Sequence, residues 1–176
     1  MIRFVSLILI CSVLSSCKKL DEYTKFEMDF NEKTVIPSST GVNLPFNVFS
    51  PDIETDSENT FAINDTRKDL IEEIHLTQLD LRLTSPSNSD FSFLESISIF
   101  ISAEGLSELK IAWKDEVDPN TDDTLILDIA DDDLQEYIKK NEFKLRVNAV
   151  TDEFLTSDHH INIHTRFFVD AIILGQ

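Results

Sequence analysis

The segment LTQLDLRLTSPSNSDFSFLESISIFISAEGLSELKIAW, residues 76–113, decides the fold. Apolar residues recur in it at every second position in three runs, and two groups of turn-forming residues, 85–90 and 103–105, separate the runs. Alternation at a period of two is typical of strands that bury one face, and Gly, Pro, Ser, Asn and Asp are typical of turns. The segment therefore predicts three consecutive strands at the centre of the core.

The apolar pattern shifts once inside the first of these strands. Apolar residues stand at even positions up to Leu76 and at odd positions from Leu79 onward, so the change falls at Thr77 and Gln78. Such a shift predicts a β-bulge or a strand that crosses between two sheets.

The rest of the chain predicts five further strands, at 23–30, 44–49, 125–129, 143–149 and 161–169, from the same alternation. Acidic residues at the start of Asp131–Lys140 and lysines at its end predict a helix there. A cap at 64–66 predicts a short helix over Arg67–Glu73, whereas Ser50–Thr60 is expected to be a loop.

Alternating strands must stack as two sheets or close into a barrel to bury their apolar faces. The sequence thus predicts one domain over 23–176: an immunoglobulin-like antiparallel β-sandwich of about eight strands with one or two short helices.

The first twenty residues have the features of a secretory leader. Arg3 precedes the apolar run Phe4–Leu14, which is too short to span ~30 Å of hydrocarbon as a helix. The LSSC sequence at 14–17 resembles the lipobox of bacterial lipoproteins. The resemblance implies that residues 1–16 are a signal peptide, that Cys17 becomes an acylated N-terminus that anchors the protein in the outer membrane, and that 17–22 form a tether. Cleavage by the ordinary signal peptidase, with Cys17 incidental, remains an alternative.

The sequence KKLDE at 18–22 resembles a loose version of the export signal of surface lipoproteins in Bacteroidetes, interrupted by Leu20. A plain polar tether is the alternative, so the sequence leaves open whether the domain faces the cell surface or the periplasm.

Charge and composition exclude several classes of function. The net charge is −18, which opposes binding to nucleic acids because too few cations are present to release counterions. Both cysteines belong to the first seventeen residues, so the mature domain is expected to have no disulfide and no thiolate site. The charge either keeps the protein soluble or favours divalent cations or a basic partner.

Three groups of residues were candidates for metal binding. Asp118, Asn120 and Asp122 resemble alternate ligands of a calcium loop, although Asp123 and Ile129 stand where such a loop needs Gly and Glu; the alternative is a solvated turn.

The acidic run 131–133 either binds a cation or caps the predicted helix, and capping explains all three residues. His160 and His164 would lie ~13 Å apart on a strand, too far to share a zinc ion, and His159 would point to the opposite face from His160. We therefore predict that they belong to a polar strand face and that the protein needs no metal or other cofactor.

Phe100 and Phe168 lie opposite the core-facing residues of their strands, so they line either a second buried layer or a binding patch. The chain has no nucleophile elbow, phosphate-binding loop, dinucleotide fingerprint or H-E-x-x-H, so we predict that it is not an enzyme.

The mature chain resembles small outer-membrane lipoproteins of Flavobacteria and other Bacteroidetes. The likeness is carried by NDTRKDLI at 64–71, FSFL at 91–94 and IAW at 111–113. The resemblance implies a location and no activity. The leading hypothesis is a non-catalytic binding or structural module with a protein or glycan partner. The alternative is a periplasmic carrier of a lipid or other hydrophobic ligand, which would require an apolar cavity.

Overall fold

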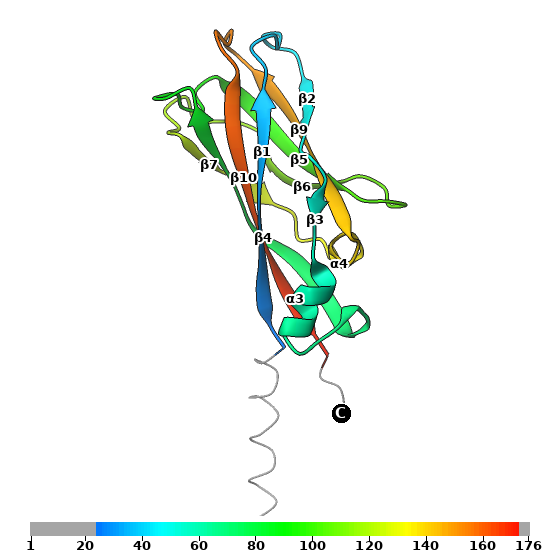
Figure 1. Ribbon diagram of the computed structural model, residues 1–176. Coiled ribbons are helices and arrows are strands. Elements are labelled where there is room, and N and C mark those ends of the chain that lie inside the picture. The colour runs from blue at the N-terminus through cyan, green and yellow to red at the C-terminus, as the bar shows by residue number, and fades with distance from the viewer. Residues whose placement is uncertain (1–23, 173–176) are drawn as a thin grey trace, which may run out of the picture.

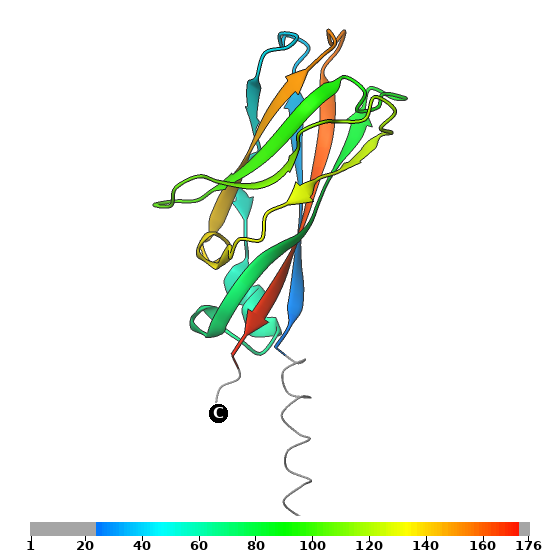
Figure 2. The same ribbon diagram turned by 180° about the vertical axis from the view of Figure 1, so that it is seen from behind.

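A computed structural model describes residues 24–172 as two antiparallel sheets packed face to face (Figures 1 and 2). The strands and helices in chain order are β1 (Phe26–Ile36), β2 (Phe46–Phe49), β3 (Ile53–Glu54), α3 (Ser57–Ile63), the 3-10 helix η1 (Lys68–Leu70), β4 (Ile71–Ser85), β5 (Leu94–Ser102), β6 (Leu109–Lys114), β7 (Thr124–Ile126), β8 (Asp128–Ile129), α4 (Gln135–Ile138), β9 (Glu142–Thr151) and β10 (His159–Ala171). One sheet has the order β1-β10-β4-β7, and the other has β2-β9-β5-β6-β8, with β3 also paired to β9. The predicted mainly β antiparallel sandwich is confirmed, and three strands of two or three residues raise the count above eight.

The two longest strands, β4 and β10, form the middle of the four-stranded sheet. Every second side chain of β10 is buried from His159 to Ala171, as alternation requires. In β4 the register against β10 shifts between Leu76 and Gln78, so Thr77 is the extra residue of a β-bulge. Of the two alternatives predicted at this position, the structure shows the β-bulge, which returns Leu79 to the buried face after Leu76.

The core between the sheets is built around phenylalanine rings. Phe143 and Phe167 are fully buried, and both pack edge-on against Phe30 of β1 at centroid distances of 5.3 and 5.7 Å. Edge-to-face contacts suit the ring quadrupole, and burial of rings of this size is a major source of stability. These rings connect both sheets into one core.

The predicted strand 125–129 is divided between the two sheets. Leu125 pairs with Leu81 of β4, whereas Ile129 pairs with Ala112 of β6. The chain crosses from one sheet to the other at Leu127, whose N–H donates to the Leu79 carbonyl. The prediction of one continuous strand is therefore wrong, because alternation along the chain cannot show which sheet each residue joins.

The predicted helix over 131–140 is wrong in its first half. Its helical part is Gln135–Ile138 only. Asp133 forms a bridge with His75, and its Oδ1 accepts hydrogen bonds from the N–H groups of Ile74 and Gln135, both at 3.0 Å. Tertiary contacts of Asp133 with β4 thus keep residues 131–133 out of the helix.

The first helix of the structure lies earlier in the chain than the helix that the sequence predicts. The loop predicted over Ser50–Thr60 is wrong at its end, because Ser57–Ile63 form α3, and the helix predicted over 67–73 is reduced to η1 before β4 begins at Ile71. The fully buried Phe61 fixes α3 against the core and contacts Phe26 edge-on.

The described chain begins and ends at one end of the sandwich. Phe26 pairs with Val169, and Ile71 with Ala171, so the start of β1 and the end of β10 lie beside the start of β4 (Figure 1). The opposite end carries the loops 37–45, 86–93 and 152–158 (Figures 1 and 2). We call these the chain-entry end and the far end.

Candidate functional sites on the sandwich

Cys17, the predicted lipidation site, lies outside the described residues, as does Cys11. The signal peptide, the tether and the acylation therefore remain predictions. Within residues 24–172 no helix is both long and apolar enough to cross a membrane.

The loop with Asp118, Asn120 and Asp122 is folded on itself. Oδ1 of Asp118 accepts hydrogen bonds from the N–H of Asn120 at 2.8 Å and from its amide nitrogen Nδ2 at 2.9 Å. These bonds lower the pKa of Asp118. Among the described residues no three His, Cys, Asp or Glu side chains are grouped to hold a metal ion. The Asp118 carboxylate therefore closes a turn.

The three histidines near the C-terminus occupy different environments. His159 is buried and its Nδ1 lies 2.9 Å from the Ser157 carbonyl, whereas the neighbouring His160 is exposed on the other face of β10. His164 is bound on both sides, by Asp80 and by Asp29. As predicted, His160 and His164 lie on a polar strand face; His159 is instead part of the core.

Phe100 and Phe168, which lie opposite the core-facing residues of β5 and β10, are both half-buried. Phe100 lies under Arg146, whose guanidinium carbon is 4.0 Å from the ring centroid. Arg146 also binds both carboxylate oxygens of Glu108 at 2.7 and 2.6 Å, which raises the pKa of Arg146 and lowers that of Glu108. The ring of Phe100 is thus covered by an ion pair.

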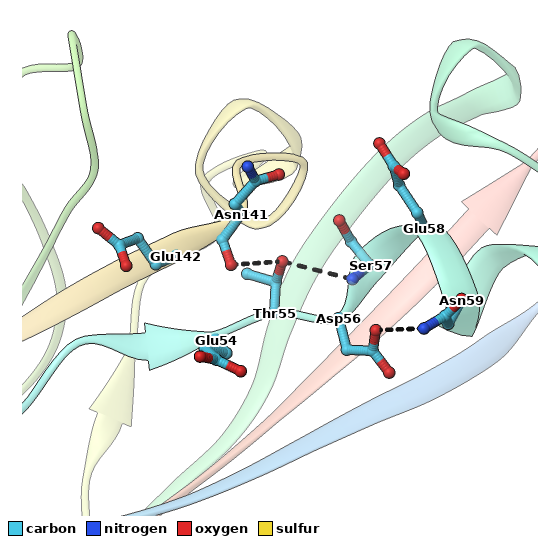
Figure 3. A pocket seen from close by; sticks show the side chains of 8 residues that line it. All are labelled: Glu54, Thr55, Asp56, Ser57, Glu58, Asn59, Asn141 and Glu142. Carbon is cyan, nitrogen blue, oxygen red and sulfur yellow. Dashed lines mark hydrogen bonds between the residues drawn. The ribbon is translucent and has the colours of Figure 1, made fainter.

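One hollow, of about 700 Å³, lies beside the start of α3 and is lined by residues 54–59, 141 and 142 (Figure 3). We call it the α3 hollow. Thr55 donates its hydroxyl to the Lys140 carbonyl at 2.6 Å, and Asn59 donates to Asp56 at 2.7 Å, so the backbone around it is well fixed.

Four of the eight lining residues of the α3 hollow are acidic: Glu54, Asp56, Glu58 and Glu142. Figure 3 shows Glu54 and Asp56 on one side of the chain and Glu58 on the other, so these carboxylates do not converge on one point. Glu58 is also paired with Lys68 at 3.4 Å. The hollow repels anions, and its geometry does not define a chelating site.

A second hollow, of about 280 Å³, lies at the far end between the loops 88–93 and 153–159. We call it the far-end hollow. Its lining combines hydroxyl, amide and carboxylate groups with the rings of Phe93, Phe154 and His159. Phe154 is 81% exposed, one of the two most exposed large apolar side chains among the described residues.

The sequence predicts a turn at 85–90 but does not bring it together with residues 153–159. Residues 88 and 154 are far apart in the chain, and the pairing of β5 with β9 and of β4 with β10 places their loops side by side. An exposed Phe within a polar loop was the one available signal.

No family model and no curated protein matches this chain. Solved structures that match this chain weakly include one of Desmodium yellow mottle tymovirus, with 11% identity, a TM-score of 0.29, and coverage of 86% of this chain and 85% of that chain. Others are Turnip yellow mosaic virus, with 8% identity, a TM-score of 0.28 and coverage of 86% and 98%, and Cocksfoot mottle virus, with 6%, 0.29 and 85% of both chains. Similarities this low carry no argument about function.

Proposed function

We propose that this protein is a lipid-anchored lipoprotein of the bacterial outer membrane that acts as a non-catalytic binding or structural module. Acyl chains on Cys17 hold it in the membrane, and the sandwich presents its far end to a protein or glycan partner. The proposal uses the leader and lipobox of residues 1–17 together with the arrangement of the described domain.

The observation that carries the proposal is the position of the two chain ends relative to the loops. The chain enters at Phe26, and β1 then runs the length of the sandwich to Ile36, where it pairs with His159 at the far end. Ten residue steps at ~3.3 Å give a height of ~33 Å. An anchor before Phe26 would therefore leave the far-end loops as the part of the domain most distant from the bilayer.

The tether limits how far the domain can move from the membrane. Seven residue steps separate Cys17 from Thr24, which span at most ~25 Å when fully extended. The chain-entry end would thus stay close to the lipid headgroups. Several acyl chains make such an anchor stable, since each buried methylene contributes ~0.8 kcal/mol and one chain alone binds weakly.

A carrier of hydrophobic ligands would need an apolar cavity between the sheets. The α3 hollow and the far-end hollow are open and lined mainly by polar residues, and the fully buried Phe143 and Phe167 occupy the interior. No observation on the described residues favours the carrier.

The test compares the two cysteines of the leader region. The full chain, with Cys17→Ala or Cys11→Ala, is expressed in a bacterium that acylates its lipoproteins and is fed an alkyne-labelled fatty acid. We expect Cys17→Ala to lose the label and leave the outer-membrane fraction, whereas Cys11→Ala keeps both. Label on the Cys17→Ala protein would contradict the proposal. Digestion by proteinase K in intact cells, against lysed cells as control, would then show which face carries the domain.

A further inference from the structure

The loops of the far-end hollow are held in place without a ligand. Asp90 Oδ1 accepts a hydrogen bond from the Ser92 N–H at 3.0 Å, and the Phe91 N–H donates to the Asp122 carbonyl. In the second loop, Asp158 accepts two hydrogen bonds from Ser38, from its N–H at 2.8 Å and from its hydroxyl at 2.9 Å. A hollow with fixed walls loses little conformational entropy on binding.

Aromatic rings form the base of the hollow. Phe93 and His159 are more than nine-tenths buried, with ring centroids 4.6 Å apart. His159 uses Nδ1 toward the Ser157 carbonyl, which can only accept, so Nδ1 carries a proton. The other ring nitrogen, Nε2, makes no hydrogen bond within residues 24–172. A buried histidine with one unpaired ring nitrogen thus lines the hollow.

The residues that line the walls and rim of the far-end hollow limit the chemical classes of ligand that it can bind. Ser89, Ser92 and Thr156 offer hydroxyl groups, Asp90 and Glu153 offer carboxylates, and no Lys or Arg lines the hollow. Carboxylates without a basic neighbour disfavour phosphate and other anions. A hollow of about 280 Å³ with polar walls is also unsuited to an acyl chain.

We propose that the far-end hollow binds a saccharide, with Phe154 against the face of a sugar ring and the polar groups of both loops around the ring's hydroxyls. A pyranose has C–H groups on its faces and hydroxyl groups at its edge, so it matches an exposed aromatic face beside acceptors and hydroxyls. A globular partner would need a contact of about 800 Å² on this domain, made by about 20–30 residues, whereas ten residues line the far-end hollow. The assignment rests on the proposed function for its setting, since anchoring would leave this end free to meet a glycan.

The test uses the full chain purified from membranes in detergent micelles, on an array of oligomers of glucose, mannose, galactose and N-acetylglucosamine. Calorimetry with the best oligosaccharide then compares two substitutions of exposed phenylalanines, Phe154→Ala in the far-end hollow and Phe49→Ala on β2, which is 62% exposed and outside it. Thr156→Val removes a hydroxyl from the hollow with little change of shape. The circular dichroism of each variant checks its folding.

We expect Phe154→Ala to weaken binding about tenfold, as for the loss of a single aromatic contact, and Phe49→Ala to leave the dissociation constant unchanged within about twofold. Thr156→Val is expected to weaken binding severalfold. The assignment is overturned if no oligosaccharide binds at roughly 0.1 mM protein, or if the two Phe substitutions have the same effect. Either result would leave the acylation of Cys17 untouched, so a failure here is distinguishable from failure of the proposed function.

Discussion

Nδ1 of His164 on β10 lies 3.0 Å from Oδ1 of Asp80 on β4. On the other side of the ring, Nε2 lies 3.0 Å from Oδ1 of Asp29 on β1, so one imidazole joins three adjacent strands on the outer face of the sheet. A carboxylate only accepts, so both contacts need an N–H, which is the protonated ring. The hydrogen bond to Asp80 is the main cause that raises the pKa of His164, and burial opposes it. Arg166 is the main cause that lowers the pKa of Asp29.

The His164 contacts predict a stability that depends on pH. The folded-state pKa lies above the ordinary value near 6.5, so the stabilisation is fully present below ~6.5 and is lost as the pH rises through the folded pKa. We expect His164→Gln to cost about 1 kcal/mol at pH 5.5 and less at pH 9, measured by urea unfolding. His160→Gln, in an exposed residue of the same strand, is the control. An equal loss at both pH values would contradict this reading.

The phenylalanine core predicts a large contrast between two similar substitutions. Phe143→Ala removes a fully buried ring that contacts both Phe30 and Phe167, and should lower the free energy of unfolding by about 3–5 kcal/mol. Phe154→Ala removes an exposed ring and should change it by less than about 0.5 kcal/mol. Chemical denaturation of both variants measures the difference in the free energy of unfolding. Similar losses for the two variants would contradict the packing described for Phe143.

Arg146 predicts that a charge-conserving substitution is costly. Its side chain is 19% exposed, binds Glu108 through two parallel hydrogen bonds and covers the ring of Phe100. Lysine keeps the charge but not the planar fork, so Arg146→Lys should cost about 1–2 kcal/mol. Arg82→Lys serves as the control because Arg82 is 66% exposed and lies 3.7 Å from its partner Asp123. Equal thermal shifts for the two variants would refute the role of the fork.

The turn between β5 and β6 makes a prediction about backbone conformation. Gly105 has a φ of +74°, which side chains disfavour even though a Cβ there would meet no atom within 4 Å. Gly105→Ala should therefore destabilise the domain by about 1 kcal/mol, as measured by thermal unfolding. In the control, Gly41→Ala, the new Cβ meets only the flexible side chain of Leu44 at 3.2 Å. A larger cost at Gly41 would contradict the argument.

Alternation in the sequence was sufficient to predict the two-sheet sandwich and to place an irregularity at Thr77 and Gln78, because burial of one strand face is a local property of the chain. It left open whether a β-bulge or a strand that crosses between sheets causes the irregularity. It could not predict that the chain changes sheets at Leu127 or that Asp133 is held by β4. Those outcomes depend on which strands become neighbours. A single buried ring, Phe61, was too weak a signal for α3 within a polar stretch.

The candidate sites also combine local features, which could be predicted from the sequence, with features that depend on which strands are neighbours, which could not. The separation of His159 from His160 across the strand could be predicted from the period of two. The binding of His164 by Asp29 and Asp80 could not, because it requires the order β1-β10-β4. The far-end hollow likewise exists because β5 pairs with β9 and β4 pairs with β10.

The central claim, an anchor at Cys17, is tested most directly by the intact mass of the protein extracted from outer membranes. The account predicts a chain that begins at Cys17 and is heavier than its 160 residues by the mass of acyl chains, with a fragment spectrum that places them on Cys17. A chain that retains residues 1–16, or one that contains an unmodified Cys17, would contradict it.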